Sequence, residues 1–176
     1  MADIRLHIGG VEVKEGWSIL NIQPGPGVDY VGTCTDLSAI PDESCSEVYT
    51  SHTLEHLGYN GELQRALKEI YRVMKPGARL RVSVPDLDIL CRMFLYPDLK
   101  PEERFEVMRM MFGGRVDAYD IHGVGLNFPI LSGYLTGAGF HNIERVAEFH
   151  LFKDTSSFLF GGHPVSLNVR AWKPAV

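Results

Sequence analysis

Apolar and polar residues alternate in short blocks along the chain, and seven of the apolar blocks have the length and β-branched content of strands. Each block is bounded by Gly, Pro or Asp, which favour turns. The predicted strands are Ile4–Ile8, Trp17–Ile22, Asp29–Gly32, Glu47–Thr50, Leu80–Val84, Ile143–Phe149 and Val165–Trp172.

The clearest helical pattern lies between the fourth and fifth strands. Residues 61–75 repeat apolar side chains at helical spacing, with Asn60 as a candidate N-cap and Pro76-Gly77 as a stop signal. We expect one face of this helix to be buried against the sheet: Leu63, Leu67, Ile70 and Met74.

Three further helices are predicted. One covers Asp86–Leu95, and a second opens at Pro101 and runs to Gly113-Gly114. A third follows Asn127 and ends at Gly139. The apolar faces are Phe105, Met108 and Phe112 in the second of these, and Leu131, Leu135 and Ala138 in the third.

Alternating strands and helices predict a doubly wound α/β fold with a mostly parallel seven-stranded sheet, covered on both faces and closed by an antiparallel C-terminal edge. Residues 1–176 are expected to form a single domain. The nine residues from Gly9 to Trp17 are too few for a full crossover, so the first helix is reduced or these strands are misassigned. We expect residues 99–126 to cap the carboxyl edge of the sheet, where such folds bind ligands, as a lid or cap.

The net charge and the cysteine content exclude several classes of partner and of metal or disulfide framework. The 176 residues carry 17 Lys and Arg against 22 Asp and Glu, a net charge of -5, which disfavours nucleic acid and anionic membranes as partners. Cys34, Cys45 and Cys91 form neither a disulfide framework nor a CxxC motif. With no leader-like start and no long apolar run, we expect a soluble cytoplasmic protein.

Two strand ends carry candidate ligand-binding residues. Gly9-Gly10 follow the first strand, where glycines let a ligand approach the backbone or simply form a tight turn. Gln23 ends the second strand, where nucleotide-binding folds place an acidic residue. Asp36-Leu37 follow the third strand and serve either an adenine ring or a turn.

A third candidate follows the fourth strand. Residues His52 to His56 match the H-x-x-E-H pattern of zinc peptidases, which on a helix places two imidazoles one turn apart. No long helix precedes Gly58, so we expect no metal site here.

Together these segments resemble the class I S-adenosylmethionine-dependent methyltransferases, of the small bacterial type with a shortened N-terminal half. The specific stretches are 51–57 (SHTLEHL), 67–77 (LKEIYRVMKPG) and Val84-Pro85-Asp86; weaker ones are Leu6–Gly10, Gly16-Trp17, Asn21-Ile22, Thr35–Leu37, Tyr119–His122 and Ala138–Phe140. The resemblance implies a Rossmann-like sheet and S-adenosylmethionine as cofactor. Members usually have a G-x-G where this chain has Gly9-Gly10-Val11, and an Asp where it has Gln23, so we expect modest cofactor affinity.

The resemblance also implies roles for individual residues. Gly9 and Gly10 would admit the methionine end of the cofactor, Gln23 would face the ribose, Asp36 and Leu37 the adenine, and Ser51 and His52 would flank the sulfonium. His52 and His122 are the candidate general bases, and Asp120 would orient His122. The alternative for these side chains is a purely structural role.

The function expected from the resemblance is methyl transfer to a small molecule or a glycan-type hydroxyl. A catalytically degenerate relative that binds a ligand or partner is the alternative, motivated by Gly9-Gly10 and Gln23. Residues 99–126 act either as a lid or as the surface of a homodimer that uses Met108, Met111 and Phe112.

Overall fold

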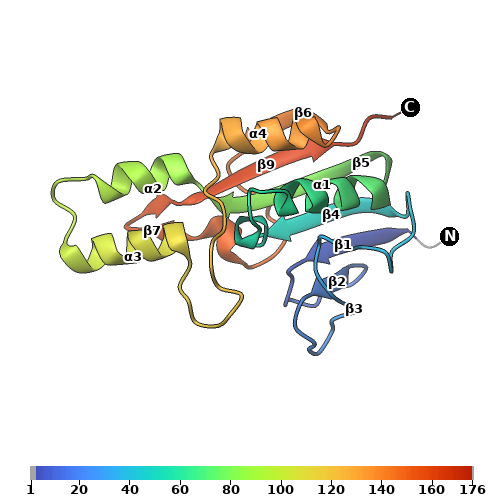
Figure 1. The fold of residues 1–176 in the computed structure, drawn as a ribbon, viewed down its shortest axis with the longest axis horizontal. Coiled ribbons are helices and arrows are strands. Elements are labelled where there is room, and N and C mark those ends of the chain that lie inside the picture. The colour runs from blue at the N-terminus through green and yellow to red at the C-terminus, as the bar shows by residue number, and fades with distance from the viewer. Residues whose placement is uncertain (1–2, 176) are drawn as a thin grey trace.

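A seven-stranded sheet organises the chain in a computed structural model that describes residues 3–175. Its strand order is β3-β2-β1-β4-β5-β9-β6 (Figure 1). Strands β1 to β5 are parallel, and β9 is antiparallel to both β5 and β6. All seven predicted strands and the antiparallel C-terminal edge are therefore confirmed: β1 Ile4–Ile8, β2 Ser18–Asn21, β3 Tyr30–Val31, β4 Cys45–Ser51, β5 Met74–Pro85, β6 His141–Val146 and β9 Ser166–Trp172.

The predicted helices also form, with small differences at their ends. They are α1 Glu62–Val73, α2 Leu87–Phe94, α3 Pro101–Phe112 and α4 Phe128–Gly137. The sequence did not predict the 3-10 turns η1 Leu54–His56 and η2 Thr155–Ser157, nor the hairpin of β7 Leu159–Phe160 and β8 His163–Pro164. None of the helices in residues 3–175 combines the length and hydropathy needed to cross a membrane.

Helix α1 buries the predicted face, because Leu63, Leu67, Ile70 and Met74 are all inaccessible to solvent. Its expected N-cap was wrong: Gly61 occupies that position at φ 120°, and no side chain caps the helix. The caps of α2 and α4 are side chains. Asp86 accepts hydrogen bonds from the N–H groups of residues 88 and 89, and Asn127 accepts one from residue 130.

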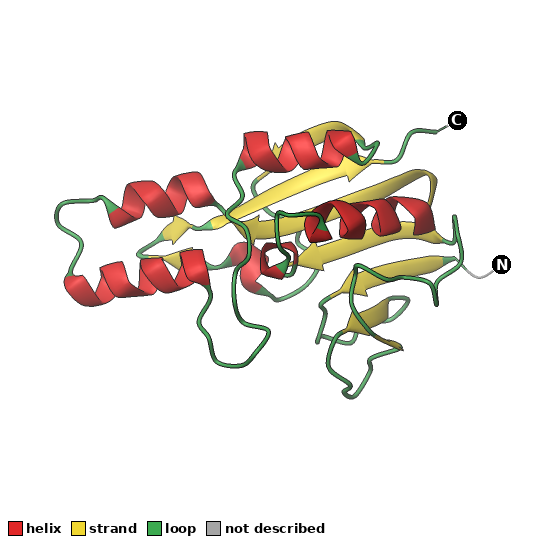
Figure 2. Cartoon of the chain, in the orientation of Figure 1, coloured by secondary structure: helices red, strands yellow, loops and turns green. Residues whose placement is uncertain are grey.

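The predicted apolar face of α3 was wrong. Phe105 and Phe112 are more than half exposed, and Val107 is the buried residue. Helices α2 and α3 project past the carboxyl edge of the sheet (Figure 2), where they pack on each other with Leu90, Val107 and Val165 at the centre. Because α3 packs on α2 and not on the sheet, a different face of α3 is buried.

The two faces of the sheet are covered differently. Helices α1 and α4 lie over one face (Figure 1) and build the main core with the side chains of β1, β4, β5 and β9. On the other face, Trp17 and Tyr49 pack with Phe149 and Phe152 of the segment that follows β6. Figure 2 shows only loops between β1, β2 and β3, so the first helix is absent and the predicted strands are correctly assigned.

Candidate functional site

A cleft of about 570 Å³ opens at the carboxyl ends of β1, β2 and β4, the edge that the sequence analysis selected. Gly9, Asn21 and Ile22 line one side of it. The loop after β4 contributes His52, Thr53 and His56, and residues 117–121 of the loop after α3 complete the wall. Its volume lies within the usual range of ligand sites, about 300–1,000 Å³.

The two glycines after β1 are required by close packing. Gly9 has φ 76°, and a Cβ atom there would lie 2.0 Å from Thr53 Oγ1. A Cβ atom on Gly10 would lie 2.5 Å from the ring of His7. Gly9 presents its backbone to the cleft, whereas Gly10 is buried and outside the lining. The loop therefore needs both glycines, and only one of them reaches the site.

Asn21, and not Gln23, ends β2 at the cleft. Its side chain donates to the Gly10 carbonyl at 3.0 Å and accepts from the Gln23 N–H at 2.9 Å. Gln23 is exposed and does not line the cleft. The predicted strand ended one residue late, at Ile22, so Gln23 was selected two positions beyond Asn21; the polar Asn21 after Ile19-Leu20 is the signal that identifies the observed end.

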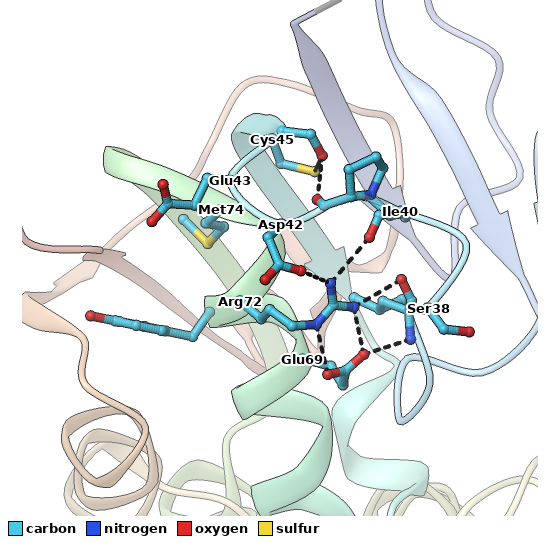
Figure 3. A network of polar contacts seen from close by, with 12 residues as sticks. Ser38, Ile40, Asp42, Glu43, Cys45, Glu69, Arg72 and Met74 are labelled. Carbon is cyan, nitrogen blue, oxygen red and sulfur yellow. Dashed lines mark hydrogen bonds and ion pairs between the residues drawn. The ribbon is translucent and has the colours of Figure 1, made fainter. Parts of the chain in front are cut away.

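Asp36 and Leu37 belong to a turn that α1 holds in place. The Asp36 carboxylate accepts from Ser38, and its bonds with Ser38 keep the Asp36 pKa below its usual value. Leu37 is 1% exposed in the main core. Its N–H donates to Glu69 and its carbonyl accepts from Arg72, a network shown in Figure 3. Neither Asp36 nor Leu37 lines the cleft, and their contact with adenine stays a prediction.

His52 lines the cleft with its ring held from both sides. Its Nε2 lies 2.9 Å from Ser166 Oγ, and that hydroxyl donates to the Thr155 carbonyl at 2.8 Å. A hydroxyl has one proton, so His52 Nε2 must be the donor to Ser166. The Nδ1 atom lies 3.3 Å from Glu55 Oε1. Neighbouring Ser51 lies outside the lining, and its Oγ is buried with no hydrogen-bond partner among the described residues.

The two other predicted catalytic residues, Asp120 and His122, lie on the loop after α3. Burial would raise the pKa of Asp120, but hydrogen bonds from the backbone N–H groups of Val116 and Gly114 lower it overall. No hydrogen bond in the described chain joins Asp120 to His122, and the orienting role of Asp120 stays a prediction. Burial lowers the pKa of His122 and favours its neutral form.

His122 is not among the residues that line the cleft. It packs edge-on against His56, with ring centroids 4.9 Å apart and an interplanar angle of 78°. His122 and Glu55 border a small internal cavity of about 10 Å³. Glu55 and His56 were not selected as site residues from the sequence, because the contact with His122 joins segments far apart in the chain.

Comparison with known proteins agrees with the geometry. Residues 11–82 match the family model described as a methyltransferase domain. No curated protein matches.

Several solved structures share the fold over nearly the whole chain. A SAM-dependent methyltransferase from Archaeoglobus fulgidus aligns with a TM-score of 0.60 at 15% identity, over 98% of this chain and 86% of that one. One from Methanosarcina mazei gives 0.60 at 17% identity, over 99% and 94%. The Burkholderia thailandensis 1,6-didemethyltoxoflavin-N1-methyltransferase, solved with S-adenosylhomocysteine, gives 0.59 at 13% identity, over 98% and 72%. At these identities the likeness shows the fold.

Proposed function

The chain has the class I S-adenosylmethionine-dependent methyltransferase fold, with a methyltransferase domain over residues 11–82, and we propose that it transfers a methyl group from S-adenosylmethionine to a small-molecule or glycan-type acceptor. The observation that carries the proposal is the cleft at the carboxyl ends of β1, β2 and β4. Ligands of open α/β sheets bind at this edge.

The cleft residues suit the cofactor in two ways. Gly9 offers backbone without a side chain, which leaves room for the methionine end. Asn21 uses one of its two N–H donors on Gly10 and keeps the other free for a ribose hydroxyl. An amide bonds a hydroxyl more weakly than a carboxylate does, so we expect modest affinity.

Charge in the cleft favours a cationic ligand. Glu62, Asp117 and Asp120 line it, and its lining holds no Lys or Arg among the described residues. The sulfonium of S-adenosylmethionine, which supplies the methyl group, is a cation that these carboxylates stabilise. Phosphate-rich acceptors are repelled, so the acceptor we propose is neutral or cationic.

In the proposed reaction His52 helps to position the acceptor and does not transfer a proton through Nε2. Its Nε2 proton is already donated to Ser166, which fixes the ring at the cleft wall beside the expected methyl position. Methyl transfer depends mainly on holding donor and acceptor in line at reacting distance. The imidazole can therefore shape the acceptor pocket while its hydrogen bond to Ser166 stays intact.

Titration calorimetry with S-adenosylhomocysteine tests the cofactor site. We expect one site per chain, with Asn21→Ala weakening binding about tenfold through the loss of one to two hydrogen bonds. Gln23→Ala is the matched control and should bind as the wild type does. No binding by the folded wild type would refute the proposal, and a loss in Gln23→Ala equal to that in Asn21→Ala would refute the assigned ribose contact.

A further inference from the structure

Three side chains that the cofactor proposal does not use lie close together beside the cleft, which His56 lines. Glu55 and His56 belong to the 3-10 turn η1, and His122 lies on the loop after α3. Each offers one metal-ligating atom, and these atoms all lie within 4.8 Å of one another. This set combines two imidazoles with one carboxylate.

Glu55 supplies an independent sign that a cation belongs here. Its side chain is 2% exposed, and both carboxylate oxygens are buried with no hydrogen-bond partner among the described residues. The one ion-pair contact in the described residues is to His52 Nδ1, 3.3 Å from Glu55 Oε1, and it neutralises the carboxylate only when the His52 ring is charged. A buried carboxylate is costly unless it is paired or coordinates a metal ion. Glu55 makes no hydrogen bond in the described chain, and a neutral His52 leaves its charge to be balanced by a cation.

One ring nitrogen of His56 is free to bind a metal ion. Its Nδ1 lies 3.2 Å from the Ile121 carbonyl oxygen, which can only accept, so Nδ1 carries the proton. The lone pair of Nε2 is then free. Metal-binding histidines usually donate their other N–H to a carbonyl or carboxylate in this way.

The backbone of Glu55 holds the third ligand near the first two. Its carbonyl accepts from the N–H groups of Gly123, at 2.7 Å, and Val124, at 3.2 Å. These bonds fix the chain immediately after His122 against η1. His122 is therefore positioned by the same residue that supplies the carboxylate.

We propose that Glu55, His56 and His122 bind one divalent first-row transition-metal ion, of which Zn²⁺ is the representative. Imidazole nitrogen with carboxylate oxygen is a donor set typical of Zn²⁺ and Fe²⁺, whereas Mg²⁺ and Ca²⁺ prefer oxygen alone. Zinc bonds of about 2.0–2.1 Å place tetrahedral ligand atoms about 3.4 Å apart, so the ligands move together by roughly 1 Å on binding.

His52 is not part of this set, which separates the site from the zinc-peptidase pattern. His52 Nε2 is bound to Ser166, and the second imidazole comes from His122, 66 residues after His56. From the sequence we expected no metal site here, because no long helix precedes Gly58; His122 was not considered as a ligand.

The ion has a consequence for the acceptor, and this part rests on the proposed function. His56 lines the cleft, whereas Glu55 and His122 border a separate small cavity. In the proposed site the remaining coordination positions of the ion open on the His56 side, towards the cleft. They suit an acceptor that presents a hydroxyl or carbonyl oxygen, which the ion binds and orients.

Zn²⁺ titration of chelator-treated protein tests the site directly. We expect one Zn²⁺ per chain in the wild type and at least tenfold weaker binding in Glu55→Gln, His56→Gln and His122→Ala. His150→Ala and His163→Ala, which remove exposed histidines elsewhere, are the controls and should bind as the wild type does. Wild-type binding no tighter than that of the three ligand variants would overturn the proposal.

Melting temperatures give a second readout that does not depend on activity. Without metal, Glu55→Gln should melt at or above the wild-type temperature, because it removes an unpaired buried charge. With Zn²⁺ the wild type should rise above the variant through mass action. A Glu55→Gln protein that melts lower without metal and rises with Zn²⁺ as the wild type does would show a purely structural role for Glu55.

S-adenosylhomocysteine titrations on the same preparations keep the two proposals apart. Zn²⁺ binding without S-adenosylhomocysteine binding would refute the proposed function and leave the metal site standing. The reverse result would refute the metal site alone.

Discussion

His52 Nε2 and Ser166 Oγ, 2.9 Å apart, join the loop after β4 to the first residue of β9. Because Ser166 gives its own proton to Thr155, the imidazole must donate, and Nε2 stays protonated whether the ring is neutral or charged. The sequence analysis names His52 as a candidate general base, and a base that acts through Nε2 would require this bond to break. The other ring nitrogen, Nδ1, lies 3.3 Å from Glu55 Oε1.

We therefore predict that nitrogen NMR of His52 finds the proton on Nε2 at neutral pH. Ser166→Ala should release the ring and lower the free energy of unfolding by about 1–2 kcal/mol, with little loss from Ser157→Ala at an exposed position. A neutral ring protonated only on Nδ1 would contradict the assigned donor.

A second prediction concerns Arg72, which holds the 37–42 segment against α1. The guanidinium makes a two-pronged bond to Glu69 and also bonds Asp42 and the carbonyls of Leu37 and Ile40 (Figure 3). Arg72→Gln should lower the free energy of unfolding by about 2–3 kcal/mol, because charge-assisted bonds are lost and partly buried acceptors are left unpaired.

Arg65→Gln is the control for this experiment. It lies exposed on the same helix and should change stability by less than about 0.5 kcal/mol. Equal losses from both substitutions in a chemical melt would show that Arg72 acts only as a helix residue.

The third prediction tests the main core. Leu67 is inaccessible on the face of α1 that meets the sheet, so Leu67→Ala should cost about 2–5 kcal/mol through lost contacts and a cavity. Lys68→Ala, one position along and exposed, should be close to neutral. Equal unfolding free energies for the two variants in a chemical melt would show that Leu67 does not lie on the buried face of α1.

Local patterns predicted the parts of the fold that local interactions determine. Helical spacing identified the buried face of α1, and Asp86 and Asn127 proved to be the caps of α2 and α4. The buried face predicted for α3, with Phe105 and Phe112, was wrong. This helix packs outside the sheet, and spacing along the sequence does not indicate what a helix packs against.

For the candidate site too, the sequence predicted the residues that local structure places and missed those that tertiary contacts bring together. Gly9 and His52 were found because each directly follows a strand, and strand ends meet at one edge. Glu55 and His122 were not paired, since their contact depends on how the loop after α3 returns to η1.

A fourth prediction concerns pH and His7. Burial among Tyr49 and Phe152 lowers the His7 pKa from 6.5 to about 4, although Asp154 and Glu12 oppose this. Between these values the unfolded chain binds a proton that the folded chain does not, so stability falls as pH drops from 6.5 towards 4. The full effect is up to about 3 kcal/mol.

His7→Phe should flatten this part of the pH profile. The measurement is the difference in unfolding free energy between pH 7 and pH 4.5, compared between the wild type and the variant. An unchanged slope would mean that other groups produce the loss.

The fifth prediction treats residues 114–121 as the mobile part of the proposed lid. The segment is bounded by Gly113, at φ 89°, and by the anchored Gly123 and Val124. Amide hydrogen exchange at 115–119 should be faster than at 123–124 in the free protein, and should slow when S-adenosylhomocysteine binds.

The rival interpretation is a homodimer face on α3, where Phe105 and Phe112 are exposed. Slow exchange at 115–119 in the free protein that becomes faster on dilution would support the dimer face and contradict the lid.

The position of β9 has a consequence for the order in which the sheet assembles during synthesis. Among residues 3–175, β9 is the one strand that pairs with β6, yet β9 follows it in the chain after residues 147–165. A ribosome releases β6 before its neighbour exists, so that strand waits unpaired with its backbone in water. Until β9 is synthesised, the sheet of the nascent chain can contain only β1 to β5, with β5 at its edge. Strand β9 then pairs with both β5 and β6 and completes the sheet.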